Sequence, residues 1–597
     1  MDSLSFELLV LVTEHLDHRA HLNFSLINRR CRSAALPRIL STITIAFDTS
    51  QELDASVSQL TSVLASTANH NHVRHLKVIG ADLQIYYDPE YEGLFARPPE
   101  YWSYARPSYR LPELWISETQ WQPLGSLVEG LPMLKDVTWA TREQIPLRIL
   151  RHLHTMVPRC RLHMRSFHLQ SLSQSGDEIL KISSHDLELA TSPCLYSLVR
   201  YQEFDGHNDH NEQAIYEMLA GGAPNLKEVF YQWFEGGQYL AKSLASRKPR
   251  QAWQPGTIEP SADSVGRLES LAFKVRGYGI MRMHNIRTDL SALRSLELFQ
   301  YLSRENFDWL LGKSREFSGL QQLTIGWQRR HFDVSFFLAL PALRSLCLYD
   351  LYDVEAMCTI IEHSSQCLRV LQLKSNFYNP KLFSTILDNC PYLEELGLNI
   401  SRDAGSLEEV ATYRSFGKLP ALRTVALQLH TRHDFSEYRY LEPGQHQNLD
   451  LSDRHSKLRG ILVDLAVDEA LARSIFNAIA SAKEAKDSPL ESLELSVHVP
   501  KYEVDEVTRF LEFVGRSWRC TRLFDGSKDA YSCSVELLDP REAGTRESIV
   551  EEEWLIGLME NEDAPAVHDV WPKSRDIAVE DAWHSFPLSG GSCPTRE

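Results

Sequence analysis

The chain has 597 residues, of which 43% are hydrophobic and 24% are charged, an ordinary composition for a globular protein. This length exceeds one hydrophobic core, so we expect several domains or an array of repeats. The formal net charge of −18 argues against nonspecific nucleic-acid binding, which needs a basic surface.

The lengths of the apolar runs and the spacing of the cysteines indicate the cellular compartment of the protein. No apolar run reaches the roughly 20 residues that cross a bilayer, and Glu7 and Glu14 interrupt the first apolar stretch, so no signal peptide is expected. The 10 cysteines contain no C-x-x-C pair, which predicts reduced thiols instead of disulfides or a four-cysteine zinc site. We therefore expect a cytoplasmic and/or nuclear protein with no membrane partner and no cofactor.

The first forty residues predict a small module of three helices. Apolar residues recur at three- and four-residue spacing, Asp17 and His18 separate the first two helices, and Ala34, Ala35 and Leu36 close a third turn. The two apolar stripes comprise Leu4, Leu8, Leu9, Val12 and Leu16, then Leu22, Leu26 and Ile27.

At these residues the segment resembles an F-box, the helical domain that binds a Skp-type adaptor of cullin-based ubiquitin ligases. The leucine-proline, acidic and double-leucine opening of that family corresponds to Leu4, Ser5, Glu7, Leu8 and Leu9. Its later apolar, basic and aromatic run corresponds to Leu26, Ile27, Arg29, Arg30 and Cys31. Ser5 replaces the usual proline and Cys31 the usual aromatic residue, which implies weaker adaptor binding.

The resemblance implies a non-catalytic, substrate-recruiting subunit whose partners are the adaptor, a cullin bound through it, and a protein substrate. The adaptor-binding residues would be Leu4, Leu8, Leu9, Val12, Leu16, Leu22, Leu26 and Ile27. Periodicity alone leaves another interpretation open, in which the helices only cap the repeats behind them. The chain would then be a leucine-rich-repeat scaffold that joins no ligase.

Internal repetition dominates the middle of the chain. The pattern L-x-x-L-x-L recurs with starts 23 to 29 residues apart, a period in the range of leucine-rich repeats, which pair one short strand with one helix. Its clear copies are Leu268-Leu271-Phe273, Leu293-Leu296-Leu298, Leu320-Leu323-Ile325, Leu343-Leu346-Leu348, Leu368-Leu371-Leu373, Leu393-Leu396-Leu398 and Leu422-Val425-Leu427. Weaker copies are Val73-Leu76-Val78, Leu134-Val137-Trp139, Leu195-Leu198, Leu226-Val229-Tyr231 and Leu490-Leu493-Leu495.

The resemblance to leucine-rich repeats covers residues from about 70 to 500, in a degenerate style similar to F-box repeat proteins of filamentous fungi. We therefore expect an α/β fold, with a three-helix module at 1–45. A curved solenoid at 46–540 would follow, with parallel strands inside and helices outside. An acidic capping helix and disordered tail would occupy 541–597, where 13 acidic and 5 basic residues lie.

Two segments interrupt the repeats, and the tail has two parts of its own. Residues 84–121 are rich in aromatic residues and proline, which predicts a packed loop that covers an early repeat or forms an aromatic wall of a binding site. Residues 246–265 predict an exposed loop. Residues 551–559 predict a short helix that caps the last repeat or docks on a partner, and 587–597 predict disorder.

Several clusters carry residue types that could support chemistry. Zinc-type residues occur at His152, His154, Cys160 and His163, at His70, His72 and His75, and at His207, Asp209, His210 and Glu212. Their spacings match no zinc motif, so no metal site is predicted. The chain also lacks a phosphate loop, a nucleophile elbow and an H-E-x-x-H motif. An intrinsic hydrolase is therefore not favoured, and no catalytic residue is predicted.

Alternation along the repeat strands places the leucines in the core and the residues between them on the concave surface. These concave positions include Ser270, Ala272, Ser295, Glu297, Lys274 and Lys374. Aromatic residues gather where the strands end, which predicts a substrate-binding patch, unless they fold back onto adjacent turns. The predicted residues are Phe299, Tyr301, Trp327, Tyr349, Tyr352 and Lys374. Only two lysines lie on this face, so phosphate recognition is not predicted.

Overall fold

The fold is given by a computed structural model of the chain. The structure describes residues 4–16, 18–67, 69–80, 118–141, 143–172, 182–203, 211–234, 265–275, 287–298, 304–326, 333–349, 351–374, 379–433, 451–498, 510–511, 513–523, 533–538, 564–571 and 583–588. These residues form two compact units, Met1–Leu320 and Gln321–Glu597.

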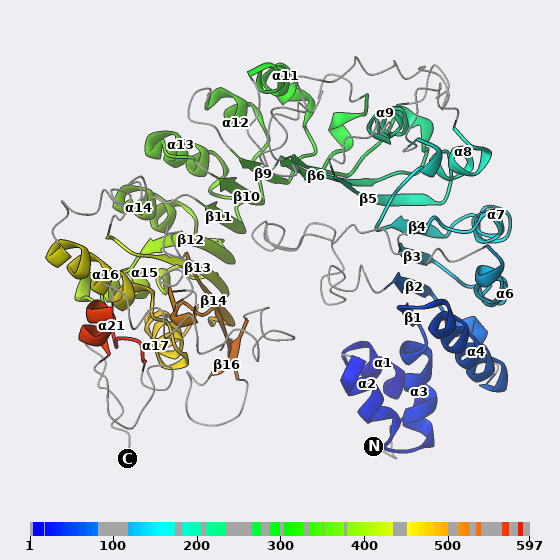
Figure 1. Ribbon diagram of the computed structural model, residues 1–597, viewed down its shortest axis with the longest axis horizontal. Coiled ribbons are helices and arrows are strands. Elements are labelled where there is room, and N and C mark those ends of the chain that lie inside the picture. Colours follow the sequence, from blue (N-terminus) through cyan, green and yellow to red (C-terminus); the bar gives the residue numbers. More distant parts are fainter. Residues whose placement is uncertain are drawn as a thin grey trace. The chain divides into compact units, whose positions relative to one another are not determined.

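The first unit is built of parallel strands joined by helices (Figure 1). Its strands are β1 Thr42–Phe47, β2 His75–Gly80, β3 Asp136–Ala140, β4 Arg161–Met164, β5 Leu195–Glu203, β6 Glu228–Phe234, β7 Ser270–Val275 and β8 Ser295–Leu298. Its helices are α1 Phe6–Glu14, α2 His18–Ser25, α3 Arg29–Ile39, α4 Ser50–Thr67, α6 Gln122–Glu129, α7 Leu147–Met156, α8 Ser184–Ala190, α9 Asn211–Glu217 and α11 Arg304–Lys313. Short helical turns are η1 His70–His72, η3 Glu118–Trp121, η4 Gln170–Leu172, η5 Met218–Gly222, η7 Leu290–Ala292 and η8 Ser314–Glu316.

The second unit repeats this plan and ends in two antiparallel strands. Its strands are β9 Gln322–Gly326, β10 Ser345–Tyr349, β11 Val370–Lys374, β12 Glu395–Ser401, β13 Thr424–His430, β14 Ser492–Val497, β15 Trp518–Arg522 and β16 Cys533–Leu537. Its helices are α12 Ser335–Ala339, α13 Val354–Ser364, α14 Pro380–Asn389, α15 Leu407–Phe416, α16 Leu451–Leu465, α17 Glu469–Ala480 and α21 Ala564–Val570.

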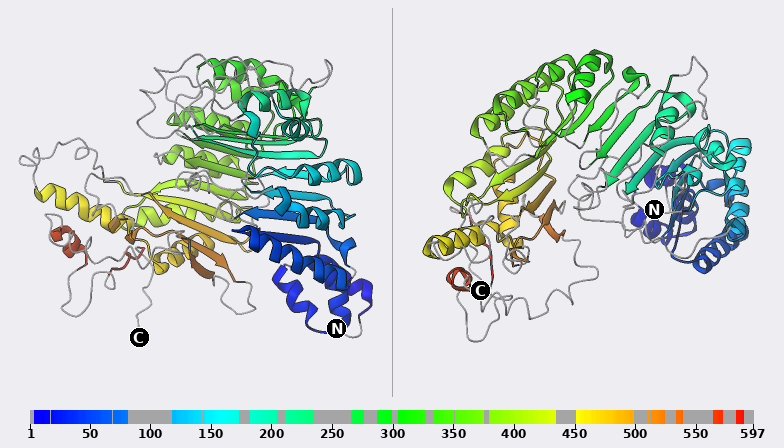
Figure 2. Two further views of the ribbon diagram at one scale, coloured as in Figure 1. Left: turned by 45° about the vertical axis from the view of Figure 1, so that its right-hand side comes forward. Right: turned by 45° about the horizontal axis from the view of Figure 1, so that its top comes forward.

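The leucines of the repeat stack from strand to strand. Leu346 is in register with Leu371, and Leu348 with Leu373, and all four are buried. The helices α13, α14 and α15 lie on one face of these strands (Figures 1 and 2), so each repeat buries its strand leucines against its own helix and its neighbours. Within each unit this arrangement is consistent with the predicted leucine-rich-repeat solenoid.

Polar residues set where the helices begin. Asp353 caps α13, Asn379 caps α14 just before Pro380, and Ser406 caps α15, each by accepting a hydrogen bond from a backbone N–H of the first turn. Pro380 suits the first helical position because its missing N–H would have no partner there. The start of each of these three helices is therefore set by a capping residue in the local sequence.

The predicted strand repeats are all found, from Val73-Leu76-Val78 at β2 to Leu490-Leu493-Leu495 at β14. Strands β1, β4, β15 and β16 lie outside these predicted repeats, because their sequences lack the leucine pattern. Residues 84–117 of the predicted segment 84–121, residues 246–264 of the predicted segment 246–265, and all of 551–559 lie outside the described residues. None of the described helices combines the length and apolar composition that a bilayer span requires.

The C-terminal segment packs on the second unit. Val567, Val570 and Trp571 join a buried cluster with residues of α16 and of 510–514, and Trp583 and Phe586 pack against its margin. Leu588 is also buried, so the prediction of disorder from residue 587 onward is wrong at this residue. Apolar side chains in a segment such as residues 583–588 can be buried although the segment forms no helix.

Candidate partner-binding surface

The N-terminal helices α1, α2 and α3 form a module with its own small core. Leu9, Phe24, Cys31, Ala34 and Ala35 are buried in it. Helix α3 packs against both other helices, and its two alanines allow close approach. The module thus has a buried centre that does not depend on the strands behind it.

Polar contacts fix the ends of these helices. Ser5 caps α1 by accepting from the N–H of Leu8 at 3.4 Å, and Asn28 caps α3 by accepting from the N–H of Cys31 at 2.8 Å. Arg38 Nη2 contacts Glu14 Oε1 at 2.9 Å, which joins α3 to α1. The pKa of Glu7 is lowered, first by a hydrogen bond from its own backbone N–H and then by Ser5.

The module carries a high concentration of exposed apolar side chains. Among the described residues fifteen large apolar side chains are exposed, and six of them lie within the 22 residues from Phe6 to Ile27. We call this set the apolar face; it comprises Phe6, Leu8, Leu11, Leu22, Leu26 and Ile27. Leu26 is 82% exposed in the turn between α2 and α3. Exposed large apolar side chains concentrated on one small module make it a candidate interaction site.

The structure divides the eight predicted adaptor-binding residues into two groups. Leu9 is buried in the core, and Leu4, Val12 and Leu16 pack partly buried against it. The exposed group is Leu8, Leu22, Leu26 and Ile27. Sequence reasoning missed Phe6 and Leu11, although Leu11 follows Leu8 at helical spacing.

The two departures from the F-box pattern have structural roles. The Ser5 hydroxyl caps a helix, which the usual proline cannot do, and the Cys31 side chain is fully buried in the core of the module. Cys31 is therefore too deep to touch a partner directly. Any effect of this cysteine on binding would act through the packing of α3.

The predicted substrate-binding residues are only partly described. Phe299, Tyr301 and Trp327 lie outside the described residues, as does the side chain of Lys374. Tyr349 is half-buried at the end of β10, and Tyr352 is exposed just beyond it. The structure therefore describes two of the six side chains, both near the end of one strand.

Part of the predicted concave surface is not exposed. Ser270, Ala272, Ser295 and Glu297 all have less than a tenth of their surface accessible. Burial raises the pKa of Glu297 to about 8, because a charged carboxylate is poorly solvated there. The assignment of these positions to an open surface is wrong.

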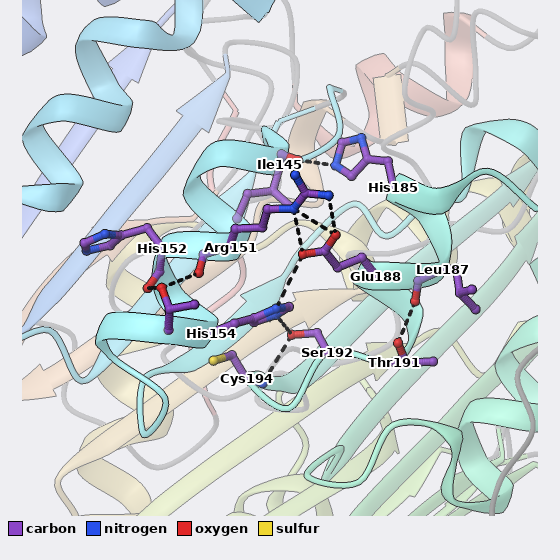
Figure 3. A network of polar contacts seen from close by, with 11 residues as sticks. Ile145, Arg151, His152, His154, His185, Leu187, Glu188, Thr191, Ser192 and Cys194 are labelled. Carbon is purple, nitrogen blue, oxygen red and sulfur yellow. Dashed lines mark hydrogen bonds and ion pairs between the residues drawn. The ribbon is translucent and has the colours of Figure 1, made fainter.

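His154 on α7, one of the residues of zinc-binding type, takes part in a polar network with α8, drawn in Figure 3. His154 Nε2 lies 2.7 Å from Ser192 Oγ, and its Nδ1 lies 3.8 Å from Glu188 Oε1, while Arg151 also contacts Glu188. Burial lowers the pKa of His154, although Glu188 opposes the shift. The Ser192 hydroxyl is fully buried and accepts from the N–H of Cys194, so it braces a turn.

A second serine-histidine-carboxylate set spans β3, β4 and β5. His163 Nδ1 lies 2.8 Å from Ser197 Oγ, and its Nε2 lies 3.1 Å from Asp136 Oδ1. Ser197 is also fully buried, so neither serine presents a nucleophile to a substrate. No group of three or more metal-ligating side chains among the described residues is arranged to hold a metal ion. Of the residues of zinc-binding type near position 210, His207, Asp209 and His210 lie outside the described residues.

Comparison with known proteins leaves the family open. No family model matches the chain, and no curated protein matches it significantly. One similar solved structure is the crystal structure of the TLR13–ssRNA13 complex, with 13% identity and a TM-score of 0.27 over 60% of this chain. The matched region spans 44% of that chain, less than half its length. So low a TM-score supports no inference about function.

Proposed function

We propose that the chain is the substrate-recruiting subunit of a Skp/cullin/F-box ubiquitin ligase. The apolar face of the N-terminal module would bind the Skp-type adaptor, and the repeats would bind a protein substrate. The chain would then supply proximity by holding the substrate near the charged ubiquitin carrier. The bond-forming chemistry would belong to partner enzymes.

The main observation that supports this proposal is the exposure of six large apolar side chains on one small module. Helices that only capped the repeats would bury their apolar residues against β1 and α4, the first elements after the module. Leu8, Leu22, Leu26 and Ile27 instead remain exposed, although Leu9 and Cys31 supply the module with a core. Apolar residues beyond those the core needs favour a partner surface.

Exposed arginines on α3 add charge to this surface. Arg29 and Arg32 are exposed on the first turns of α3, directly after Leu26 and Ile27. Residues 1–45 contain five lysine or arginine residues and four acidic ones, whereas the whole chain has a net charge of −18. The module therefore fits a partner whose apolar groove has an acidic rim.

Co-purification with the adaptor tests the proposal. The full chain and a variant that lacks residues 1–40, which ends the deletion before β1, are each co-expressed with a Skp-type adaptor and separated by size-exclusion chromatography. We expect a one-to-one complex for the full chain and none for the variant, whose repeats should keep their circular dichroism spectrum. Absence of any complex, or a complex that survives the deletion, would favour the scaffold without a ligase role.

A further inference from the structure

Basic side chains gather where strands β2, β3 and β4 begin. Arg74 precedes β2, His75 is its first residue, Lys135 precedes β3, and Arg161 is the first residue of β4. His75 is in register with Asp136, and Asp136 with Arg161. Adjacent strands lie about 4.8 Å apart, so these residues are neighbours along one edge of the sheet. We call Arg74, His75, Lys135 and Arg161 the basic edge.

Arg161 is held in place while half of its side chain stays exposed. Its Nε donates to Asp136 Oδ1, 2.6 Å away, and its guanidinium carbon lies 5.2 Å from the centre of the Tyr196 ring. The side chain is 50% exposed. An arginine already fixed by a carboxylate and an aromatic ring loses little conformational entropy when it binds an anion.

The carboxylate beneath Arg161 is itself fixed. Asp136 is buried and lies 3.1 Å from His163 Nε2 and 3.0 Å from His75 Nδ1. Burial acts to raise the pKa of Asp136, but hydrogen bonds from His163, His75 and Arg161 outweigh it and hold that pKa well below its ordinary range. Asp136 therefore stays ionised and acts as a permanent anchor for Arg161.

The basic edge differs from the same edge of the second unit. There the residues that precede successive strands pair with opposite charge: Arg369 lies 2.8 Å from Glu394, and Arg423 lies 2.8 Å from Glu491. On β2, β3 and β4 the side chains of His75, His163 and Arg161 share one carboxylate, Asp136. Arg74 donates to the backbone carbonyl of Met133. Like charges on adjacent strands destabilise a sheet, so the basic edge is not explained by strand pairing.

We propose that the basic edge binds an acidic peptide segment through its carboxylate or phosphate groups. Guanidinium groups recognise both anions with paired hydrogen bonds, and Lys135 and Arg74 add charge on the neighbouring strands. This inference rests on the proposed function only in that the peptide would belong to the recruited protein. The chain is otherwise acidic, which disfavours a nucleic acid because few phosphates could be neutralised.

Fluorescence anisotropy of the full chain tests this inference. The probes are three labelled ligands of equal length: an oligo-glutamate peptide, a phosphoserine peptide and a single-stranded oligonucleotide. The edge variant carries Arg74→Glu and Lys135→Glu, and its control carries Arg315→Glu and Lys418→Glu, two exposed sites that are not part of the basic edge. A second variant, with Arg74→Gln and Lys135→Gln, removes the charge without reversing it.

We expect the edge variant to bind the acidic peptides at least about tenfold more weakly, and the control to stay within about twofold of the original chain. The glutamine variant should lie between them. A preference for either peptide supports the inference and identifies the anion as carboxylate or phosphate. Failure of both peptides to bind, equal loss in the control, or tighter binding of the oligonucleotide would overturn it.

The outcome is separable from the adaptor interaction. The edge variant changes no residue of α1, α2 or α3, so it should co-purify with the adaptor as the original chain does. Peptide binding without adaptor binding would sustain the basic edge and refute the ligase role. Adaptor binding without peptide binding would support the ligase role and refute the basic edge as a peptide-binding site.

Discussion

Replacing Leu8 and Leu26 with glutamate should abolish adaptor binding while the chain stays folded. The two side chains are 47% and 82% exposed, so the substitutions remove little from the core. Fully burying such a side chain contributes about 1.5–3 kcal/mol. Scaled by the exposed fractions, their burial at an interface contributes about 2–4 kcal/mol, which is roughly 30- to 700-fold in Kd.

The matched control replaces Leu338 and Leu407 with glutamate in the second unit. These leucines are 46% and 73% exposed, so the two double variants change the same chemistry at nearly the same exposure. Titration calorimetry or surface plasmon resonance against the adaptor gives the Kd of each. Thermal unfolding of both variants checks that the fold is retained.

The reasoning predicts loss of binding only in the variant of the N-terminal module. If that variant binds the adaptor within about threefold of the original chain, the apolar face is not the contact surface. The same conclusion would follow if the control variant lost as much affinity, because the effect would then reflect added negative charge alone.

Three further predictions concern stability. Because the pKa of Glu297 is raised to about 8, its proton stabilises the fold fully below about pH 4.5, and this contribution is lost as the pH rises through about 8. Glu297→Gln should therefore flatten the melting temperature between pH 5 and 8, and an unchanged slope would contradict this. Arg402 and Glu409 form a fully buried ion pair at 3.1 Å, so Glu409→Gln should destabilise the second unit by about 3–5 kcal/mol in urea unfolding; a loss below about 1 kcal/mol would refute the burial argument. Asp468 caps α17 and accepts from the N–H and hydroxyl of Ser585, so Asp468→Ala should speed amide hydrogen exchange at residues 583–588, and unchanged exchange would show that Asp468 does not anchor this segment.

The repeat strands could be predicted because each leucine pattern specifies both a strand and the side it buries. Strands β15 and β16 could not, since Trp518–Arg522 and Cys533–Leu537 pair antiparallel without that pattern. The alternation of residues along β8 predicted which face of the sheet Glu297 lies on. It did not predict whether Glu297 is exposed, because exposure depends on what packs against that face.

The N-terminal module shows the same limit at the candidate site. Helical spacing identified Leu8 and Leu9 together, but only the packing of α3 decides that Leu9 is buried and Leu8 is exposed. The basic edge was missed for a related reason. Arg161 and Asp136 are 25 residues apart, and the register of β3 against β4 brings them into contact.

Hydrogen–deuterium exchange of the full chain, with and without the adaptor, tests the central claim most directly. The account predicts that the adaptor slows exchange in α1, α2 and the turn at Leu26 and Ile27, and leaves the strands of both units unchanged. Protection confined to the repeats, or no protection in the module at saturating adaptor, would contradict it.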